Sequence, residues 1–117
     1  MQYMLLIHQE AESLTAAELP QIMQEYMTFT QDLVKSGKFK AGDRLESSAG
    51  ARTVRVRNGK TMATDGPFAE TKEQLGGYYI VDAKTYDEAV AIAARIPGAR
   101  TGSIEVRAIA SMPARQA

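Results

Sequence analysis

Two segments, YMLLIH at residues 3–8 and GYYIVDA at residues 77–83, are apolar at successive positions and constrain the fold more than any other feature. Successive side chains of a strand point to opposite faces of its sheet, so strands of this composition are apolar on both faces. An antiparallel strand with one solvated face alternates polar and apolar residues instead. Both segments are therefore predicted to be strands whose two faces are covered.

A helical pattern follows the first strand. Apolar residues recur every three or four positions after Pro20, which is tolerated in a first helical turn, and Gly37 has the position of a C-terminal cap. Thr15 and Glu18 have the spacing of a capping box, which predicts a short turn before the helix. The apolar stripe consists of Ile22, Tyr26, Phe29 and Leu33.

The segment TVRVRNGKTMAT predicts a β-hairpin. Asn58-Gly59 lies between alternating residues, and these two residue types suit a type I′ turn, which needs positive φ at both positions. A two-residue turn pairs Arg57 with Lys60, and Arg55 shares their face. We interpret this basic face as a solvated surface that discourages edge-to-edge aggregation, with binding of a phosphate or carboxylate as the alternative.

The order of the elements predicts the fold class. Short strands are predicted over residues 38–45 and 103–110, and between them Thr85 and Glu88 form a capping box for a second helix, which Pro97 ends. The result is an α+β fold of the order βαββαβ with an inserted β-hairpin and both helices on one face of the sheet. The bare face would be apolar, so we expect a homodimer formed by sheet-on-sheet packing.

Composition bounds the class of protein. A chain of 117 residues is expected to form one domain over residues 1–117, with a frayed tail at residues 111–117. Fourteen basic residues balance fourteen acidic ones, so we expect no nucleic-acid binding and no membrane binding. No segment resembles a secretory leader or has the length of a membrane span, and we expect a cytoplasmic protein.

Few residues are suited to metal or cofactor binding. The chain has one histidine, no cysteine and no phosphate-binding loop, so no metal and no cofactor are predicted. A divalent-ion site formed by His8 and a carboxylate is the alternative.

His8 is the candidate general base, because an imidazole exchanges protons near neutral pH. It follows an apolar strand, where a polar group would face the rim of a cavity. Asp65 or Glu105 would be its carboxylate partner. We favour the simpler interpretation, in which His8 is a strand end in contact with solvent.

Asp65-Gly66-Pro67-Phe68 predicts a rigid turn. Glycine takes positive φ without strain, and proline fixes the next bend of the chain. The simplest interpretation of Phe68 is that its ring fills apolar space in the core.

The charged residues after this turn have two interpretations. Glu70 and Lys72 either point at a ligand or belong to one solvated helical turn over residues 70–74. Lys72 is interpreted as an ion-paired surface lysine rather than a nucleophile, because a nucleophilic lysine needs desolvation.

The phrase DGPFAETKEQLGGYYIVDA resembles the signature of the DGPF group of YCII-related proteins. YMLLIH, TVRVRNGK, DEAVAIAARIPGAR and GSIEVRAI agree with the same group along nearly the whole chain. The resemblance implies a ferredoxin-like fold that pairs as a dimeric α/β barrel, with a pocket beside the DGPF loop. The residues expected to bind a ligand are Tyr26, Gly66, Pro67, Phe68, Glu70 and Lys72.

The wider YCII group resembles muconolactone isomerases, and its shorter members carry a histidine–aspartate pair proposed as catalytic. Tyr26 stands here at the place of that histidine, and Ile96 at the place of the aspartate, which weakens a transfer of mechanism. DGPF-type members are often encoded beside sigma factors of the extracytoplasmic-function type, which implies association with a sigma factor.

We therefore expect a dimeric module that binds or senses a small molecule and is linked to sigma-factor regulation. The alternative hypothesis is a small cofactor-independent enzyme of the isomerase, lyase or hydrolase type, acting on a hydrophobic acid or lactone. In that enzyme His8 or Tyr26 would transfer a proton, and Asp65 would orient it. A third hypothesis gives the DGPF turn a structural role alone, in seating the dimer.

Overall fold

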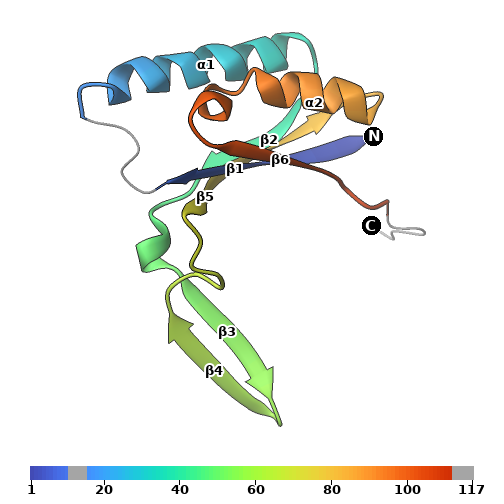
Figure 1. Ribbon diagram of the computed structural model, residues 1–117. Coiled ribbons are helices and arrows are strands. Elements are labelled where there is room, and N and C mark those ends of the chain that lie inside the picture. Colours follow the sequence, from blue (N-terminus) through green and yellow to red (C-terminus); the bar gives the residue numbers. More distant parts are fainter. Residues whose placement is uncertain (11–15, 112–117) are drawn as a thin grey trace.

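The computed structural model describes residues 1–10 and 16–111 (Figure 1). The predicted capping residue Thr15 and the predicted tail beyond residue 111 lie outside the described residues. The elements are β1 (Gln2–Glu10), α1 (Leu19–Lys35), β2 (Phe39–Arg44), η1 (Ser48–Gly50), β3 (Arg52–Arg57), β4 (Lys60–Asp65), β5 (Glu73–Asp82), α2 (Tyr86–Ala94), η2 (Pro97–Arg100) and β6 (Ser103–Ala108), where η marks a 3₁₀ helix.

Four strands form one antiparallel sheet in the order β2-β5-β1-β6. β1 is central, so that Leu5 lies opposite Tyr79 of β5 on one side and Val106 of β6 on the other. β2 pairs with the other edge of β5. The sheet and the two helices confirm the predicted α+β class, and the strand order is compatible with a ferredoxin-like fold.

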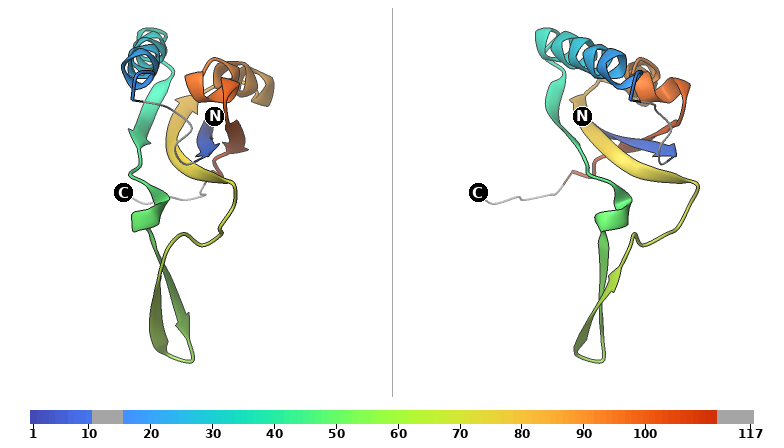
Figure 2. Two further views of the ribbon diagram at one scale, coloured as in Figure 1. Left: turned by 60° about the vertical axis from the view of Figure 1, so that its left-hand side comes forward. Right: turned by 90° about the vertical axis from the view of Figure 1, so that its left-hand side faces the viewer.

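Both helices cover the same face of the sheet, and the core lies between the two layers (Figures 1 and 2). Alternate residues of β1 and β5 are buried there, as the period of two in a strand requires. The buried core residues are Tyr3, Leu5, Ile7, Phe29, Leu33, Tyr79, Val81, Ala83, Ala89, Ile92, Ala93 and Ile96.

The helix ends follow local sequence signals. Gly37 has φ +75, and the N–H of Lys38 donates to the carbonyl of Leu33 at 3.0 Å, which confirms the predicted C-terminal cap of α1. Thr85 Oγ1 accepts a hydrogen bond from the N–H of Glu88 at 3.1 Å and so caps α2. The carboxylate of Glu88 binds Lys38 at 3.1 Å, which ties α2 to the segment between α1 and β2.

The sheet face that points away from the helices is apolar at its centre. Met4 lies opposite Ile80, and Leu6 lies opposite Tyr78. These four side chains are half-buried within the single chain. The prediction that the two central strands are apolar on both faces is therefore confirmed. We call this surface the open face.

The hairpin between β2 and β5 has the predicted turn. Asn58 and Gly59 have φ values of 53 and 76, and Arg57 lies opposite Lys60. β3 and β4 form a two-stranded sheet of their own.

This hairpin, residues 52–65, is called the hairpin arm below. It projects from the sheet on the side away from the helices (Figures 1 and 2). Val54 and Val56 lie on it and are 61% and 58% exposed. Because an isolated two-stranded hairpin is marginally stable in water, an arm with exposed valines is a surface that a further contact would stabilise.

The turn at the base of the arm is built as predicted, but the predicted burial of Phe68 is wrong. Gly66 has φ +101, its N–H donates to the carbonyl of Ala51 at 2.7 Å, and its carbonyl accepts from Thr53 Oγ1 at 3.0 Å. Phe68 is 80% exposed, and its ring centroid lies 5.5 Å from the guanidinium carbon of Arg55. The turn lies at the base of the arm, away from the core between the helices and the sheet, so its aromatic ring contacts an arm residue instead.

Gly102→Ala tests the packing of β6 against β1. A Cβ at Gly102 would overlap the backbone oxygen of His8, so β6 would have to shift. We expect the free energy of unfolding to fall by about 1–3 kcal/mol, as overpacking generally causes. Thermal melting measures the change. Gly50→Ala is the matched control, because no atom lies within 4 Å of a Cβ built there. Equal melting temperatures for the two variants would contradict the packing described here.

Candidate functional site

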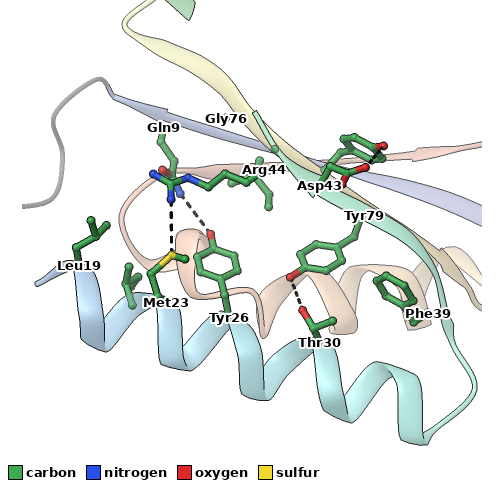
Figure 3. A pocket seen from close by; sticks show the side chains of 15 residues that line it. Gln9, Leu19, Met23, Tyr26, Thr30, Phe39, Asp43, Arg44, Gly76 and Tyr79 are labelled. Atoms are coloured by element: carbon green, nitrogen blue, oxygen red, sulfur yellow. Dashed lines mark hydrogen bonds between the residues drawn. The ribbon is translucent and has the colours of Figure 1, made fainter. Parts of the chain in front are cut away.

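A cavity of about 230 Å³ lies between α1 and the sheet (Figure 3). One wall is a row of α1 side chains that includes Leu19, Met23, Tyr26 and Thr30. The opposite wall is formed by β1, β2 and β5 near the end of the sheet that carries Gln9. Most of the lining is apolar, and the polar groups are few, which is the usual composition of a small-molecule site.

Glycines in the sheet leave the space open. Gly42, Gly76 and Gly77 all line the cavity, where larger side chains would occupy it. A Cβ at Gly42 would lie 2.8 Å from Cδ1 of Tyr79, so glycine allows the tyrosine ring to lie across β2. The cavity is thus a consequence of absent side chains on β2 and β5.

The hydroxyl of Tyr26 is held by two donors. Its Oη accepts from Gln9 Nε2 at 3.3 Å and from the N–H of Gly98 at 3.2 Å. Burial raises the pKa of Tyr26 above its ordinary value, so the phenol keeps its proton at neutral pH. Since both partners donate, neither of these bonds uses the hydroxyl hydrogen. Tyr26 can therefore donate that hydrogen to a ligand.

A second hydroxyl pair lies further along α1. Thr30 Oγ1 and Tyr79 Oη are 2.7 Å apart, and either can be the donor. Burial raises the pKa of Tyr79 as well, so this phenol also stays neutral. The pair holds two hydroxyl hydrogens and uses one of them in its mutual bond. Phe29 packs edge-on against Tyr79 at a centroid distance of 5.1 Å and fixes its ring.

Arg44 spans the cavity from the sheet side. Its side chain extends from β2 toward α1, and Nη1 donates to Met23 Sδ at 3.7 Å (Figure 3). Among the described residues no carboxylate lies within 4.0 Å of its guanidinium nitrogens. The neighbouring carboxylate of Asp43 instead accepts from the hydroxyl of Tyr78 at 2.9 Å and raises the pKa of that tyrosine.

His8 contacts Glu105, one of its two predicted partners, with 3.3 Å between Nε2 and Oε1. Ile7 lines the cavity, and His8 is the next residue of β1, so its side chain points to the open face. No ion pair joins His8 to Asp65 among the described residues. A shared role of His8 and Asp65 in catalysis stays a prediction.

The predicted ligand-binding residues of the DGPF loop do not line the cavity, whereas Tyr26 does. Asp65 is 96% exposed at its side chain and lies 3.7 Å from Arg52. Lys72 forms an ion pair with Glu10 at 3.3 Å, in agreement with its interpretation as a paired surface lysine. The alternative of a helical turn over residues 70–74 is wrong, because β5 already begins at Glu73.

The cavity lining also contains polar residues that were not expected from the sequence: Gln9, Thr30, Asp43 and Arg44. Gln9 is the next-to-last residue of β1, Arg44 is the last residue of β2, and Thr30 lies one helical turn after Tyr26. The one sequence signal for a cavity is Gly76-Gly77, which interrupts an otherwise bulky strand. That signal indicates free space but does not indicate which side chains surround it.

A second, polar hollow lies between α1 and the segment after α2. Its charges are paired, Arg95 with Asp32 at 3.5 Å and Arg100 with Glu25. The hydrogen bond from Arg100 lowers the pKa of Glu25. These pairs neutralise one another and leave the hollow without a net charge.

Metal-binding clusters and membrane-spanning helices are both absent from the described residues. No group of three or more histidine, cysteine, aspartate or glutamate side chains is placed to hold a metal ion within residues 1–10 and 16–111. In the same part of the chain, no helix combines the length and the hydropathy that crossing a membrane requires.

Comparison with known proteins gives the family. Residues 1–113 match the YCII-related domain. The chain is also 40% identical over 105 residues to a protein of Rhizobium meliloti (strain 1021) called "Uncharacterized protein R00369", and the match covers 85% of each chain. With two helices on an antiparallel sheet and a family match over nearly its whole length, this chain belongs to the YCII-related domain family.

Proposed function

We propose that this protein is a dimeric module that binds a small, mainly apolar molecule in the cavity between α1 and the sheet. The observation that carries the proposal is the hydroxyl of Tyr26 at the apolar cavity. Both of its hydrogen-bond partners are donors, so its own hydrogen stays available to a ligand. This hydrogen gives the cavity a donor at a fixed position, to which an acceptor group of a ligand can bind.

The size of the cavity supports a ligand with a single ring. A cavity of about 150 Å³ lined by apolar side chains is enough to bind benzene. The volume of about 230 Å³ leaves room for a ring and one polar substituent. Apolar walls would supply most of the affinity, and the hydroxyls of Tyr26 and of the Thr30–Tyr79 pair would set the orientation.

An enzyme is the second candidate, and Tyr26 is the observation that favours it. A phenol that is neutral and points into a cavity can act as a general acid or polarise a carbonyl. His8 and Asp65 contribute less to this hypothesis, because neither lines the cavity in the single chain.

A sensing role coupled to a sigma factor rests on the resemblance of the DGPFAETKE phrase to the DGPF group. Such a sensor requires that ligand binding changes the affinity for the sigma factor, because coupling between two sites is a free energy shared by both. Equal ligand affinity with and without the sigma factor, measured by calorimetry, would contradict this role.

A second copy of the chain is the proposed partner on the open face. Met4, Leu6, Tyr78 and Ile80 give this face an apolar centre, and packed sheets lie about 10 Å apart. The hairpin arm projects on the same side, and a strand of six residues is about 20 Å long (Figure 1). An arm of this length extends past a sheet packed at that distance, so it would lie along the flank of the partner.

The arm and the rest of the chain have complementary charges. Residues 52–65 contain four basic residues and one acidic residue, a net charge of +3. Because the whole chain has 14 of each sign, the remaining residues have a net charge of −3. This opposition favours contact between the arm of one copy and the body of the other.

Ligand binding is tested by filling the cavity. Ile22 lines it, so Ile22→Trp should place an indole in the space and abolish the binding of single-ring fragments, such as phenol, measured by saturation-transfer NMR. Met27→Trp is the matched control on the same helix, because Met27 is exposed and does not line the cavity. Binding that survives in Ile22→Trp, or that is absent from the wild type, would refute the proposed site. Fragment spectra that stay unchanged after long incubation favour binding over turnover.

The dimer is tested by charging the open face. Leu6→Lys and Ile80→Lys should convert a dimeric wild type into monomers in sedimentation-velocity experiments, because a buried unpaired ammonium strongly opposes association. Val34→Lys is the control, since Val34 is an exposed apolar residue on α1. Circular dichroism verifies that the variants stay folded. A monomeric wild type, or folded dimers of both variants, would exclude the open face as the interface.

A further inference from the structure

We infer that the cavity selects a small molecule with an apolar ring and one carboxylate group. The carboxylate binds Arg44 and the hydroxyl of Tyr26, and the ring lies between α1 and the sheet. This inference rests on the proposed function, since it names the ligand class of the same cavity. It depends on the hydrogen-bonding balance of the cavity and on the charge at one of its ends.

Hydroxyl groups of the cavity lining have hydrogens available to a ligand, whereas Asp43, the one carboxylate among the described lining residues, already accepts a hydrogen bond from Tyr78. Tyr26 has a hydroxyl hydrogen that its two partners do not use. The Thr30–Tyr79 pair has another. Gln9 has its amide N–H engaged with Tyr26, which leaves its carbonyl oxygen as a side-chain acceptor. A ligand rich in acceptors matches such a lining, whereas a ligand rich in donors would leave hydrogens unpaired.

Arg44 adds a positive charge to these available donors. The guanidinium has five N–H donors, and the contact described for it is with Met23 Sδ, a weak acceptor. Other arginines near α1 are different, because Arg95 and Arg100 are each paired with a carboxylate. Asp43, the acid next to Arg44 in the chain, is engaged by Tyr78. The described residues offer the guanidinium of Arg44 no carboxylate, so an anionic group of the ligand would supply its counter-charge.

The positions along the cavity give the orientation of the ligand. Arg44, Met23 and Gln9 lie together at one end, Tyr26 lies next to them, and Phe39 lies at the other end (Figure 3). A carboxylate at the Arg44 end can accept from the guanidinium and from Tyr26. The attached ring then extends toward Phe39 and the ring of Tyr79, which are apolar surfaces.

A carboxylate fits better than a phosphate monoester. A guanidinium and a carboxylate form two parallel hydrogen bonds, and one positive charge balances one negative charge. A phosphate monoester carries nearly two negative charges, and Arg44 is the single basic side chain among the described residues that line the cavity.

The test compares benzoate with benzamide, which has the same ring and shape without the charge. Dissociation constants are measured by NMR titration of the full chain. We expect the wild type to bind benzoate at least about tenfold more tightly than benzamide, because a charged hydrogen-bond partner strengthens the contact. Arg44→Gln should weaken benzoate by about tenfold or more and leave benzamide nearly unchanged. Lys40→Gln is the matched control, because Lys40 is an exposed basic residue of the same strand and does not line the cavity.

The outcomes separate this inference from the proposed function. Equal affinities for benzoate and benzamide in the wild type, or an unchanged benzoate affinity in Arg44→Gln, refute the carboxylate and leave the cavity as a binding site. Tighter binding of phenyl phosphate than of benzoate refutes the carboxylate in favour of a phosphate. Binding of neither benzoate nor benzamide by the wild type, together with a negative fragment screen, refutes both proposals.

Discussion

The pairing of β1 with β5 is the interaction on which the rest of the structure depends. Leu5 is fully buried opposite Tyr79, and a shift of one residue in their pairing would turn one strand over relative to the other. The register also decides which side chains of β1 face the cavity, since Ile7 lines the cavity while His8 points to the open face. Between these two residues the register with β5 shifts, and Gly76 is the additional residue on the β5 side. The bulge therefore lies beside the cavity and brings a position without a side chain to its wall.

Local chemistry explains which parts of the fold the sequence predicts well. Asn58-Gly59 determines its own turn, Gly37 ends α1, and Thr85 begins α2, because each depends on φ or on one hydrogen bond between near neighbours. The apolar character of the central strands predicts that both faces need cover. The cavity was not predictable in the same way. It forms where Met23 of α1 contacts Arg44 of β2, and that contact depends on packing between distant segments.

The DGPF loop shows how a correct local prediction can lead to a wrong tertiary one. Gly66 adopts the positive φ that the turn requires, and its hydrogen bonds to Ala51 and Thr53 close the base of the arm. An aromatic residue after such a turn suggested a place in the core, yet Phe68 packs against Arg55 outside it. The sequence specifies the shape of the turn, whereas the direction of the arm decides what the ring contacts. The DGPF phrase thus identifies the turn that connects the hairpin arm to the sheet, and it does not by itself identify a binding site.

The sheet connects the proposed ligand site with the proposed dimer interface. Tyr79 and Arg44 lie at the cavity, and the residues before them, Tyr78 and Asp43, also border it. By the alternation of a strand, the side chains of Tyr78 and Asp43 point to the open face, where they are hydrogen-bonded to each other. A ligand that moves Arg44 therefore acts on the same two strands that carry the Tyr78–Asp43 bond. By linkage, a ligand that binds the dimer more tightly than the monomer must strengthen the dimer by the same factor. A sensor needs such a connection between its ligand site and the surface that binds its partner. In this fold the adjacent residues Asp43 and Arg44 of β2, and Tyr78 and Tyr79 of β5, connect the cavity with the open face.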